Sequence, residues 1–254
     1  MKKFLAVLKG DLGRLFIYPS LQVPEDFSID YDRYWKVRGR SSMSEKGETL
    51  SLWQQDRASR AAEFIERNST VLDLGSGGGA VLEYLREKRN IKPIAVDVSA
   101  HALISLRIKG IEALELDIAS ENDVEKLPEV DYILGFEILE HLPNPEKLIH
   151  TLAKKAKKGL IFSFPNTGYY AHRLRLLFGR FPLQWVVHPG EHLRFWTMAD
   201  VRSWTPQLHL GPKSMVAYQG LPGLNRVWPA LFGAGILLVL DTTDNENQRH
   251  HSDI

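Results

Sequence analysis

Alternation of short apolar runs with helical periodicity constrains the fold of this chain more than any other feature. The apolar runs, rich in β-branched residues, are expected to be buried strands and lie at 70–74, 93–98, 112–116, 132–136 and 160–164. Helical patterns lie between them, at 80–89, 99–109, 121–127 and 145–157. Buried strands that alternate with helices form a parallel sheet covered on both faces. The sequence therefore predicts a doubly wound, Rossmann-like α/β sheet.

The ends of the helical segment at 145–157 are marked in the sequence. Asn144 precedes Pro145, which places a capping side chain before a proline at the first helical position. Gly159 follows four lysines that suit a helix C-terminus, at positions 154, 155, 157 and 158. We interpret this lysine run as a solvated helix end and not as a patch that binds nucleic acid.

Three regions follow from the pattern. Residues 1–50 show no alternation and are predicted to be an N-terminal cap, whereas 51–240 form the main domain. Within it, 166–197 is rich in aromatic, arginine and histidine residues and is expected to be an insertion over one edge of the sheet. The polar segment 241–254 is predicted to be a disordered tail.

Composition excludes several classes of protein. The chain has 254 residues, with 32 basic and 31 acidic side chains, so no polyanion-binding surface and no nucleic-acid partner are expected. It has no cysteine, which excludes disulfides, thiolate metal sites and cysteine nucleophiles. The apolar run at 227–240 contains Pro229 and is shorter than the roughly 20 residues of a membrane span. A cytoplasmic protein without an obligate partner is expected.

The N-terminus carries apolar residues at helical spacing, from Phe4 to Phe16, with lysines and Arg14 beside them. Charged residues interrupt this run, so it is not a good signal peptide. The segment could make a peripheral contact with an acidic membrane surface. The interpretation that we favour is a helix that covers the domain.

A glycine-rich turn follows the first strand, in the sequence VLDLGSGGG at 71–79. Such a turn can present backbone amides to a pyrophosphate, but Ala80 replaces the third glycine of the dinucleotide fingerprint. Asp73 stands at the mouth of the strand, where its charge would repel a phosphate and attract a cation. S-adenosylmethionine carries a sulfonium, an ammonium and no phosphate, so it is the predicted cofactor.

Two further strands end in acids. Asp97 follows Gly75 by about 20 residues, the offset at which an acid meets ribose hydroxyls, although it could equally cap the helix that starts near Ser99. Asp117 ends the third strand. There its carboxylate can accept a hydrogen bond from an adenine amino group, while the Ile118 amide donates one to the adenine ring. Because ligands of such sheets bind at the carboxyl ends of the strands, three acids there predict a cofactor site.

These stretches resemble the class I S-adenosylmethionine-dependent methyltransferases over residues 50–165, in VLDLGSGGG, AVDVS, LELDIA and DYILGFEILEHL. The resemblance implies a seven-stranded sheet whose last strand runs antiparallel, here 235–240 paired with 213–218. It also implies a set of cofactor-binding residues. These are Arg57, Asp73, Gly75, Ser76, Gly77, Asp97, Val98, Asp117, Ile118, Phe136 and Glu137. For Arg57, an exposed helix arginine is an equally good interpretation.

Two subgroups resemble the chain most. The stretch FEILEHL resembles ubiquinone-type and small-RNA 2′-O-methyltransferases, which implies transfer to a hydroxyl, here of a small-molecule acceptor. The stretches FSFPNTGYYAHRLRLLFGRFP and EHLRFWTMADV resemble MetW proteins, which implies as an alternative a regulatory partner of a biosynthetic acyltransferase. By the same resemblance, Tyr34 and Trp35 would close over the methionine part of the cofactor. The aromatic and basic residues after 166 could form an acceptor pocket.

Glu137, Glu140 and His141 follow the fourth strand at the spacing i, i+3, i+4, which predicts that all three share one face of a helical turn. His192 lies in the insertion that should fold over the same rim. Three roles are open for Glu137, Glu140, His141 and His192. A histidine can act as general base, the group can hold a divalent cation, or it can be structural.

Overall fold

The computed structural model of the chain describes residues 1–19, 50–184 and 189–243. It contains a seven-stranded sheet with the strand order β3-β2-β1-β4-β5-β7-β6. The strands are β1 (Thr70–Leu74), β2 (Lys92–Asp97), β3 (Glu112–Glu115), β4 (Val130–Phe136), β5 (Ala156–Pro165), β6 (Gly211–Tyr218) and β7 (Gly235–Asp241). β1 to β5 pair in parallel, whereas β7 pairs antiparallel with both β5 and β6. The predicted Rossmann-like sheet with an antiparallel last strand is confirmed.

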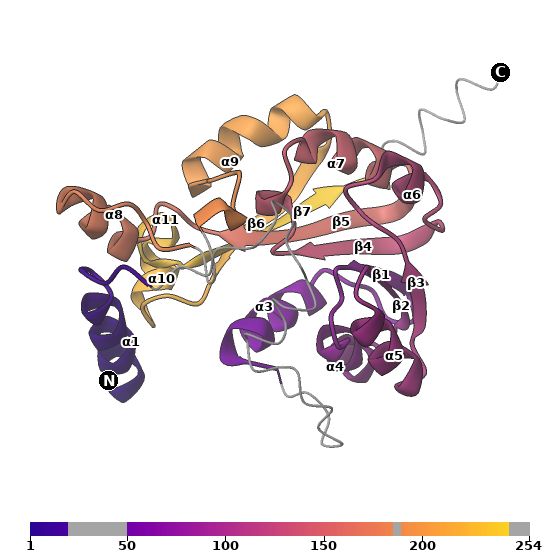
Figure 1. The fold of residues 1–254 in the computed structure, drawn as a ribbon, viewed down its shortest axis with the longest axis horizontal. Helices are drawn as coiled ribbons and strands as arrows, with labels where there is room; N and C mark the ends of the chain where they lie inside the picture. The colour runs from indigo at the N-terminus through magenta and orange to yellow at the C-terminus, as the bar shows by residue number, and fades with distance from the viewer. Residues whose placement is uncertain (20–49, 185–188, 244–254) are drawn as a thin grey trace.

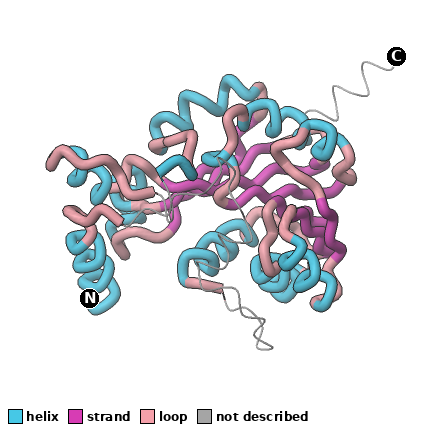
Figure 2. The backbone as a smooth tube through the Cα atoms, in the orientation of Figure 1, coloured by secondary structure: helices cyan, strands magenta, loops and turns pink. Residues whose placement is uncertain are grey.

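Helices cover both faces of the sheet (Figures 1 and 2). One layer consists of α6 (Glu121–Glu125), α7 (Pro145–Ala153) and α9 (Met198–Trp204), and the other of α3 (Leu52–Ala62), α4 (Ala80–Arg89) and α5 (Ala100–Ile108). Alternate side chains of the strands enter two separate apolar cores. On β1, Leu72 packs beneath the first layer and Val71 beneath the second. Burial of central strands on both faces explains why they appear in the sequence as continuous apolar runs.

The lysine run does not mark a helix end as predicted. Asn144 does cap α7, accepting from the amide of Lys147, but the helix stops at Ala153. β5 already begins at Ala156, so Lys157 and Lys158 lie in the strand, and Lys158 Nζ lies 2.6 Å from Glu66 Oε2. The reason is strand pairing, because β5 follows the neighbouring strand β4 from its first residue.

A side lobe lies beyond the carboxyl ends of β5 and β6, at the left of Figure 1. It contains α1 (Lys2–Gly13), α8 (Tyr170–Leu177), α10 (Leu224–Val227) and α11 (Pro229–Phe232). Asp11 of α1 accepts hydrogen bonds from the hydroxyls of Tyr169 and Tyr170, at 2.7 and 2.8 Å. The N-terminal helix is therefore fastened to the 166–197 insertion.

Several predictions concern chain ends and apolar runs. Asp241 belongs to β7 and is not part of a tail, because it pairs with Gly159 and Gly211. Residues 244–254 lie outside the described residues, as do Tyr34 and Trp35. The apolar run at 227–240 is divided among the end of α10, α11 and β7. Across 1–19, 50–184 and 189–243, no helix combines the length and the apolar character that crossing a membrane requires.

Gly235 offers a test of how tightly β7 is packed. A Cβ atom there would lie 2.3 Å from Tyr218 Cζ, and both residues are fixed by strand pairing. We expect Gly235→Ala to lower the free energy of unfolding by about 1–3 kcal/mol, the usual cost of overpacking. Gly211→Ala is the matched control, because a Cβ at Gly211 meets nothing within 4 Å. Urea denaturation of both variants measures the difference, and equal stabilities would contradict this packing.

Candidate active site

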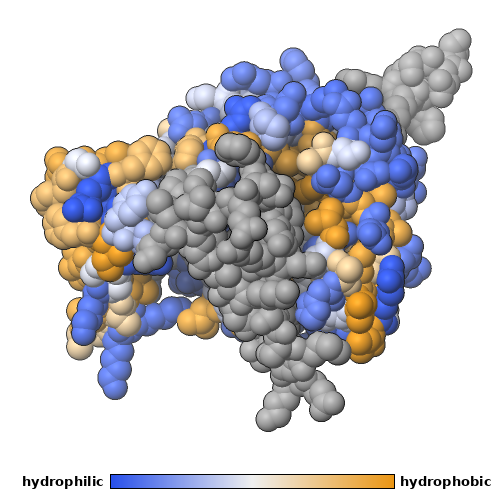
Figure 3. Space-filling model, in the orientation of Figure 1, coloured by the Kyte–Doolittle hydropathy of each residue, from blue (hydrophilic) through white to orange (hydrophobic). Residues whose placement is uncertain are grey.

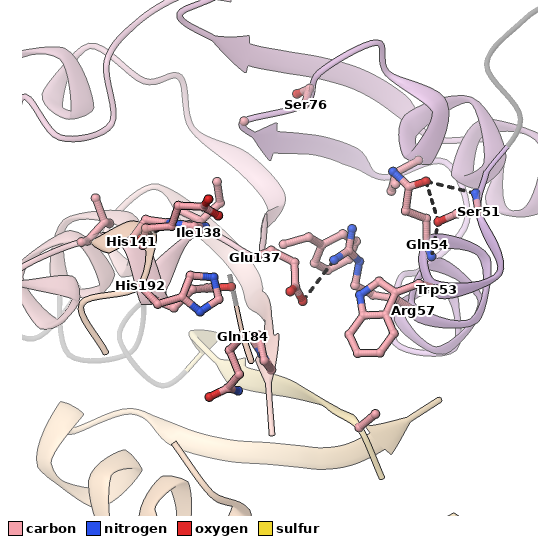
Figure 4. Close-up of a pocket in the computed structure, with 18 of the residues that line it drawn as sticks. Ser51, Trp53, Gln54, Arg57, Ser76, Glu137, Ile138, His141, Gln184 and His192 are labelled. Carbon is pink, nitrogen blue, oxygen red and sulfur yellow. Dashed lines mark hydrogen bonds and ion pairs between the residues drawn. The ribbon is translucent and has the colours of Figure 1, made fainter. Parts of the chain in front are cut away.

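A cavity of about 670 Å³ lies at the carboxyl ends of the central strands (Figure 4). At one end it is lined by the glycine turn and the three acids, Asp73, Asp97 and Asp117. At the other end it is lined by the insertion, including His192. Of the predicted site residues, all line this cavity except Gly77. The tertiary structure thus brings the predicted cofactor and acceptor residues into one space.

The glycine turn has backbone angles that favour glycine at two positions. Gly75 and Gly77 have φ angles of +62° and +53°, in the left-handed region that favours glycine. A Cβ at Gly75 would lie 2.7 Å from Ile138 Cδ1. The Ser76 hydroxyl donates to the Asp73 carbonyl at 2.6 Å, which closes the turn. A side chain at Gly75 would therefore both strain the backbone and collide with the Ile138 side chain.

Both carboxylate oxygens of Asp97 accept hydrogen bonds from backbone amides. Its Oδ2 accepts from the amide of Gly77 at 2.8 Å, and its Oδ1 accepts from the amide of Ser99 at 2.9 Å. Ser99 in turn caps α5. Asp97 thus holds the glycine turn against the start of the next helix.

Asp73 is buried, with 4% of its surface exposed, and no described residue donates a hydrogen bond to its carboxylate. Burial raises its pKa to about 7, the Arg57 charge opposes that shift and Asp97 adds to it. A buried carboxylate without donors favours either a proton or a cationic ligand. Asp117, at the opposite end of the rim, is exposed to the cavity and accepts from the Ala119 amide.

Glu137 does not share a helical face with Glu140 and His141, so that prediction is wrong. Its amide still donates to the Ser163 carbonyl of the neighbouring strand β5, but its φ of +57° turns the chain away from the strand. Only a short 3-10 turn, η1 (Leu139–His141), follows. Glu137 Oε1 lies 3.2 Å from Arg57 Nη1 and accepts from the Tyr218 hydroxyl at 2.7 Å (Figure 4). The backbone conformation at the end of β4 therefore places Glu137 away from the face that its i, i+3, i+4 spacing predicted.

Arg57 lies inside the cavity and not on the surface. Its exposed fraction is 6%, and its guanidinium carbon lies 4.7 Å from the centre of the Phe136 ring. The interpretation as an exposed helix arginine is wrong, because α3 packs its small residues against the sheet and turns Arg57 toward the strand ends.

Three further residues that the sequence analysis did not identify also line the cavity. They are Ser51, Trp53 and Gln54. Ser51 and Gln54 form a reciprocal capping box at the start of α3. The Ser-x-x-Gln spacing before a helical pattern was the available signal. Trp53 packs edge-on against Tyr218, with ring centres 4.9 Å apart. No local pattern connects these two residues.

Glu140, His141 and His192 form a compact cluster, each offering a ligand atom within 4.8 Å of the others. Glu140 is 1% exposed, and neither of its carboxylate oxygens has a hydrogen-bond partner among the described residues. Burial, and then the charge of Glu137, raise the pKa of Glu140 well above its usual value. The rings of His141 and His192 meet edge-on with centres 4.8 Å apart (Figure 4).

Backbone contacts hold this cluster together. The Glu140 carbonyl accepts from the amides of Leu193 and Arg194, at 2.7 and 3.1 Å. His141 Nδ1 lies 2.5 Å from the Glu191 carbonyl oxygen, so Nδ1 carries the proton and Nε2 is the basic nitrogen. The insertion is thereby fastened to η1, and this places His192 beside His141.

Solved structures with the same fold are S-adenosylmethionine-dependent methyltransferases. One from Archaeoglobus fulgidus has a TM-score of 0.58 and 16% identity, and the match covers 84% of this chain and 100% of that one. The magnesium protoporphyrin IX methyltransferase of Synechocystis, solved with bound S-adenosylhomocysteine, has a TM-score of 0.52 and 16% identity, covering 94% and 96%. The fold of this chain is therefore that of the class I S-adenosylmethionine-dependent methyltransferases.

The family model of the methionine biosynthesis protein MetW matches residues 55–239, and the chain belongs to that family. The chain is also similar to curated proteins of two kinds. A ubiquinone biosynthesis O-methyltransferase of Alkalilimnicola ehrlichii is 29% identical over 199 residues, which are 74% of this chain and 78% of the relative. A bifunctional methionine biosynthesis protein MetXA/MetW of Rhodopirellula baltica is 26% identical over 164 residues, which are 58% of this chain and 26% of that longer protein.

Proposed function

We propose that the protein transfers a methyl group from S-adenosylmethionine to a hydroxyl of a small molecule in the cytoplasm. The observation that carries the proposal is one cavity with an acid-lined rim at one end and the Glu140, His141 and His192 cluster at the other. The names of the O-methyltransferase relatives support hydroxyl transfer.

The residues that would hold the cofactor are those of the rim. Asp73 would receive its ammonium group, Asp97 its ribose and Asp117 its adenine amino group. When bound, the cofactor supplies a methyl group that its sulfonium already activates. The chain has then to align the acceptor oxygen with that methyl group and to exclude water, which is how enzymes accelerate such transfers.

The histidine pair is suited to take the proton that the acceptor hydroxyl loses. With Nδ1–H directed at the Glu191 carbonyl, His141 presents the basic nitrogen Nε2. Imidazole has an unperturbed pKa near 6.5, which suits a general base at neutral pH. The unpartnered oxygens of Glu140 support a second role for the cluster, because carboxylate and imidazole also bind divalent cations, which acidify a bound hydroxyl.

Cofactor binding can be tested directly by calorimetry. We expect saturable binding of S-adenosylhomocysteine at one site and no binding of NAD. The physical reason is that Asp73 repels a pyrophosphate and that Ala80 replaces the third glycine that close approach of phosphates needs. Binding of NAD without binding of S-adenosylhomocysteine would overturn the proposal.

The family match favours a second candidate, a regulatory partner of a biosynthetic acyltransferase that binds the cofactor without transferring methyl. The Rhodopirellula relative, whose name joins MetXA with MetW, supports it. Exposed apolar side chains of the side lobe, at Leu176, Leu177, Phe178 and Phe181, offer a surface for a partner (Figure 3). Co-purification of a homoserine acyltransferase, with no methylated product in an extract incubated with labelled cofactor, would favour this role over catalysis.

A further inference from the structure

The end of the cavity that is formed by α1 and α8 has a chemistry of its own. Arg14, His172 and Arg175 line it together with Asp11 and Tyr169. α1 and α8 lie in the same lobe in Figure 1, and the hydrogen bonds of Asp11 and Arg175 join them. We call this end the basic chamber.

Arg175 places a positive charge in the basic chamber without a carboxylate partner. It is 4% exposed. Its Nη1 donates to the carbonyls of Arg14, Leu15 and Ile17, and its Nε donates to the carbonyl of Phe181. Within the described ranges, no acid forms an ion pair with Arg175, and Nη2 has no acceptor. Neutral carbonyls satisfy part of a guanidinium but leave its charge uncompensated, which is costly in a buried site.

His172 supplies a second unsatisfied group. Its Nδ1 is buried and has no hydrogen-bond partner among the described residues. Burial, followed by the charges of Arg175 and Arg14, lowers the pKa of His172 to about 4. An imidazole in this surrounding is neutral at pH 7, and an anion beside it would offset the part of the shift that the two arginine charges cause.

Asp11 is the one acid among the described residues that line the basic chamber. Its Oδ2 already accepts from the hydroxyls of Tyr169 and Tyr170. Arg14 and Arg175 together carry two positive charges against this one negative charge. The described part of the chamber therefore has an excess of positive charge and unused donors, the complement of a carboxylate or phosphate.

We propose that the methyl acceptor carries an anionic group, a carboxylate or a phosphate, that binds in the basic chamber to Arg175, Arg14 and His172. The inference rests on the proposed function, because it names the class of acceptor for the same cavity. With the anion anchored on α1 and α8, the acceptor hydroxyl would meet the histidine pair, which lines the same cavity. The acceptor would then be a hydroxy acid or a phosphorylated alcohol.

The first test uses inorganic phosphate and acetate as probes. The full chain, saturated with S-adenosylhomocysteine, is titrated with each anion while NMR follows the His172 ring signal, assigned by its loss in His172→Gln. We expect a saturable shift and a rise in the pKa of His172. Arg14→Ala should weaken anion binding by about 3- to 10-fold, the loss of one partly exposed charged contact. If neither anion shifts His172, the inference is wrong whatever the activity.

Lys9→Ala is the matched control, because it removes the same charge from an exposed position of the same helix that does not line the cavity. We expect it to change anion affinity by less than about twofold, the effect of a screened surface charge. An equal loss in Arg14→Ala and Lys9→Ala would mean that only the general field of α1 attracts the anion, and would overturn a specific site.

The second test asks whether the product is an anion. The protein is incubated with a cell extract and methyl-labelled cofactor, and the labelled small molecules are passed over an anion exchanger. Retention of the label supports the inference, and its passage as a neutral product overturns it. Loss of retention after phosphatase treatment identifies a phosphate, whereas unchanged retention identifies a carboxylate. Failure of the proposed function is distinguishable, because it gives no labelled product while the NMR titration still reports on the chamber.

Discussion

Replacing His141 or His192 with alanine is expected to lower turnover on an identified acceptor by about 10²- to 10⁴-fold, the usual loss when a general base is removed. Affinity for S-adenosylhomocysteine should stay within about twofold of the unsubstituted protein. The reason is their location, because both rings lie in the cluster with Glu140, whereas the acids of the rim face the cofactor end. Steady-state kinetics and calorimetry measure the two quantities separately.

Two controls separate the roles that the cluster could play. His101→Ala removes an exposed histidine at the start of α5 and should leave turnover unchanged. If the cluster holds a divalent cation, activity of the unsubstituted protein is lost with a chelator and restored by added metal ion. Full activity of both His141→Ala and His192→Ala would make the cluster structural, and the catalytic assignment would fail while the cofactor assignment would stand.

Asp73→Asn is expected to stabilise the ligand-free protein above pH 7, by up to about 4 kcal/mol. Asp73 has a pKa of about 7 in the folded protein and 3.8 as its reference value. Because the folded state binds the proton more tightly, stability falls as the pH rises from about 4 to 7 and then stays low. Asparagine carries no charge at any of these pH values, so the stability of the Asp73→Asn protein should change less from pH 4 to 7. Denaturant unfolding of both proteins at several pH values measures the two free energies of unfolding.

The same substitution should weaken cofactor binding. The Asp73 carboxylate is the group that we assign to the cofactor ammonium, and breaking a buried charge pair costs several kcal/mol. Affinity of the unsubstituted protein should also fall below pH 7, where Asp73 becomes protonated. Glu63→Gln, at an exposed position after α3, is the control and should change neither property. An Asp73→Asn protein that binds S-adenosylhomocysteine as tightly as before would refute the assigned role.

The sequence by itself determined the sheet, the glycine turn and the rim where the three acids lie. These depend on local signals, such as the glycines at 75 and 77 and the proline after Asn144. The acids at Asp73, Asp97 and Asp117 could be placed together without a structure, because parallel strands bring their carboxyl ends to one edge. Helix α4 has the bounds that its periodicity predicts, 80–89.

Only the tertiary structure decided which of the remaining polar residues meet. Glu137 turns toward Arg57 and Tyr218 because its backbone enters the left-handed region at the strand end, which side-chain spacing does not encode. His192 reaches His141 through backbone hydrogen bonds between the insertion and η1. Arg175 becomes a buried charge only when the end of α1 packs on α8. Contacts between residues far apart in the chain depend on how whole helices and strands pack together. Periodicity within one segment does not predict them.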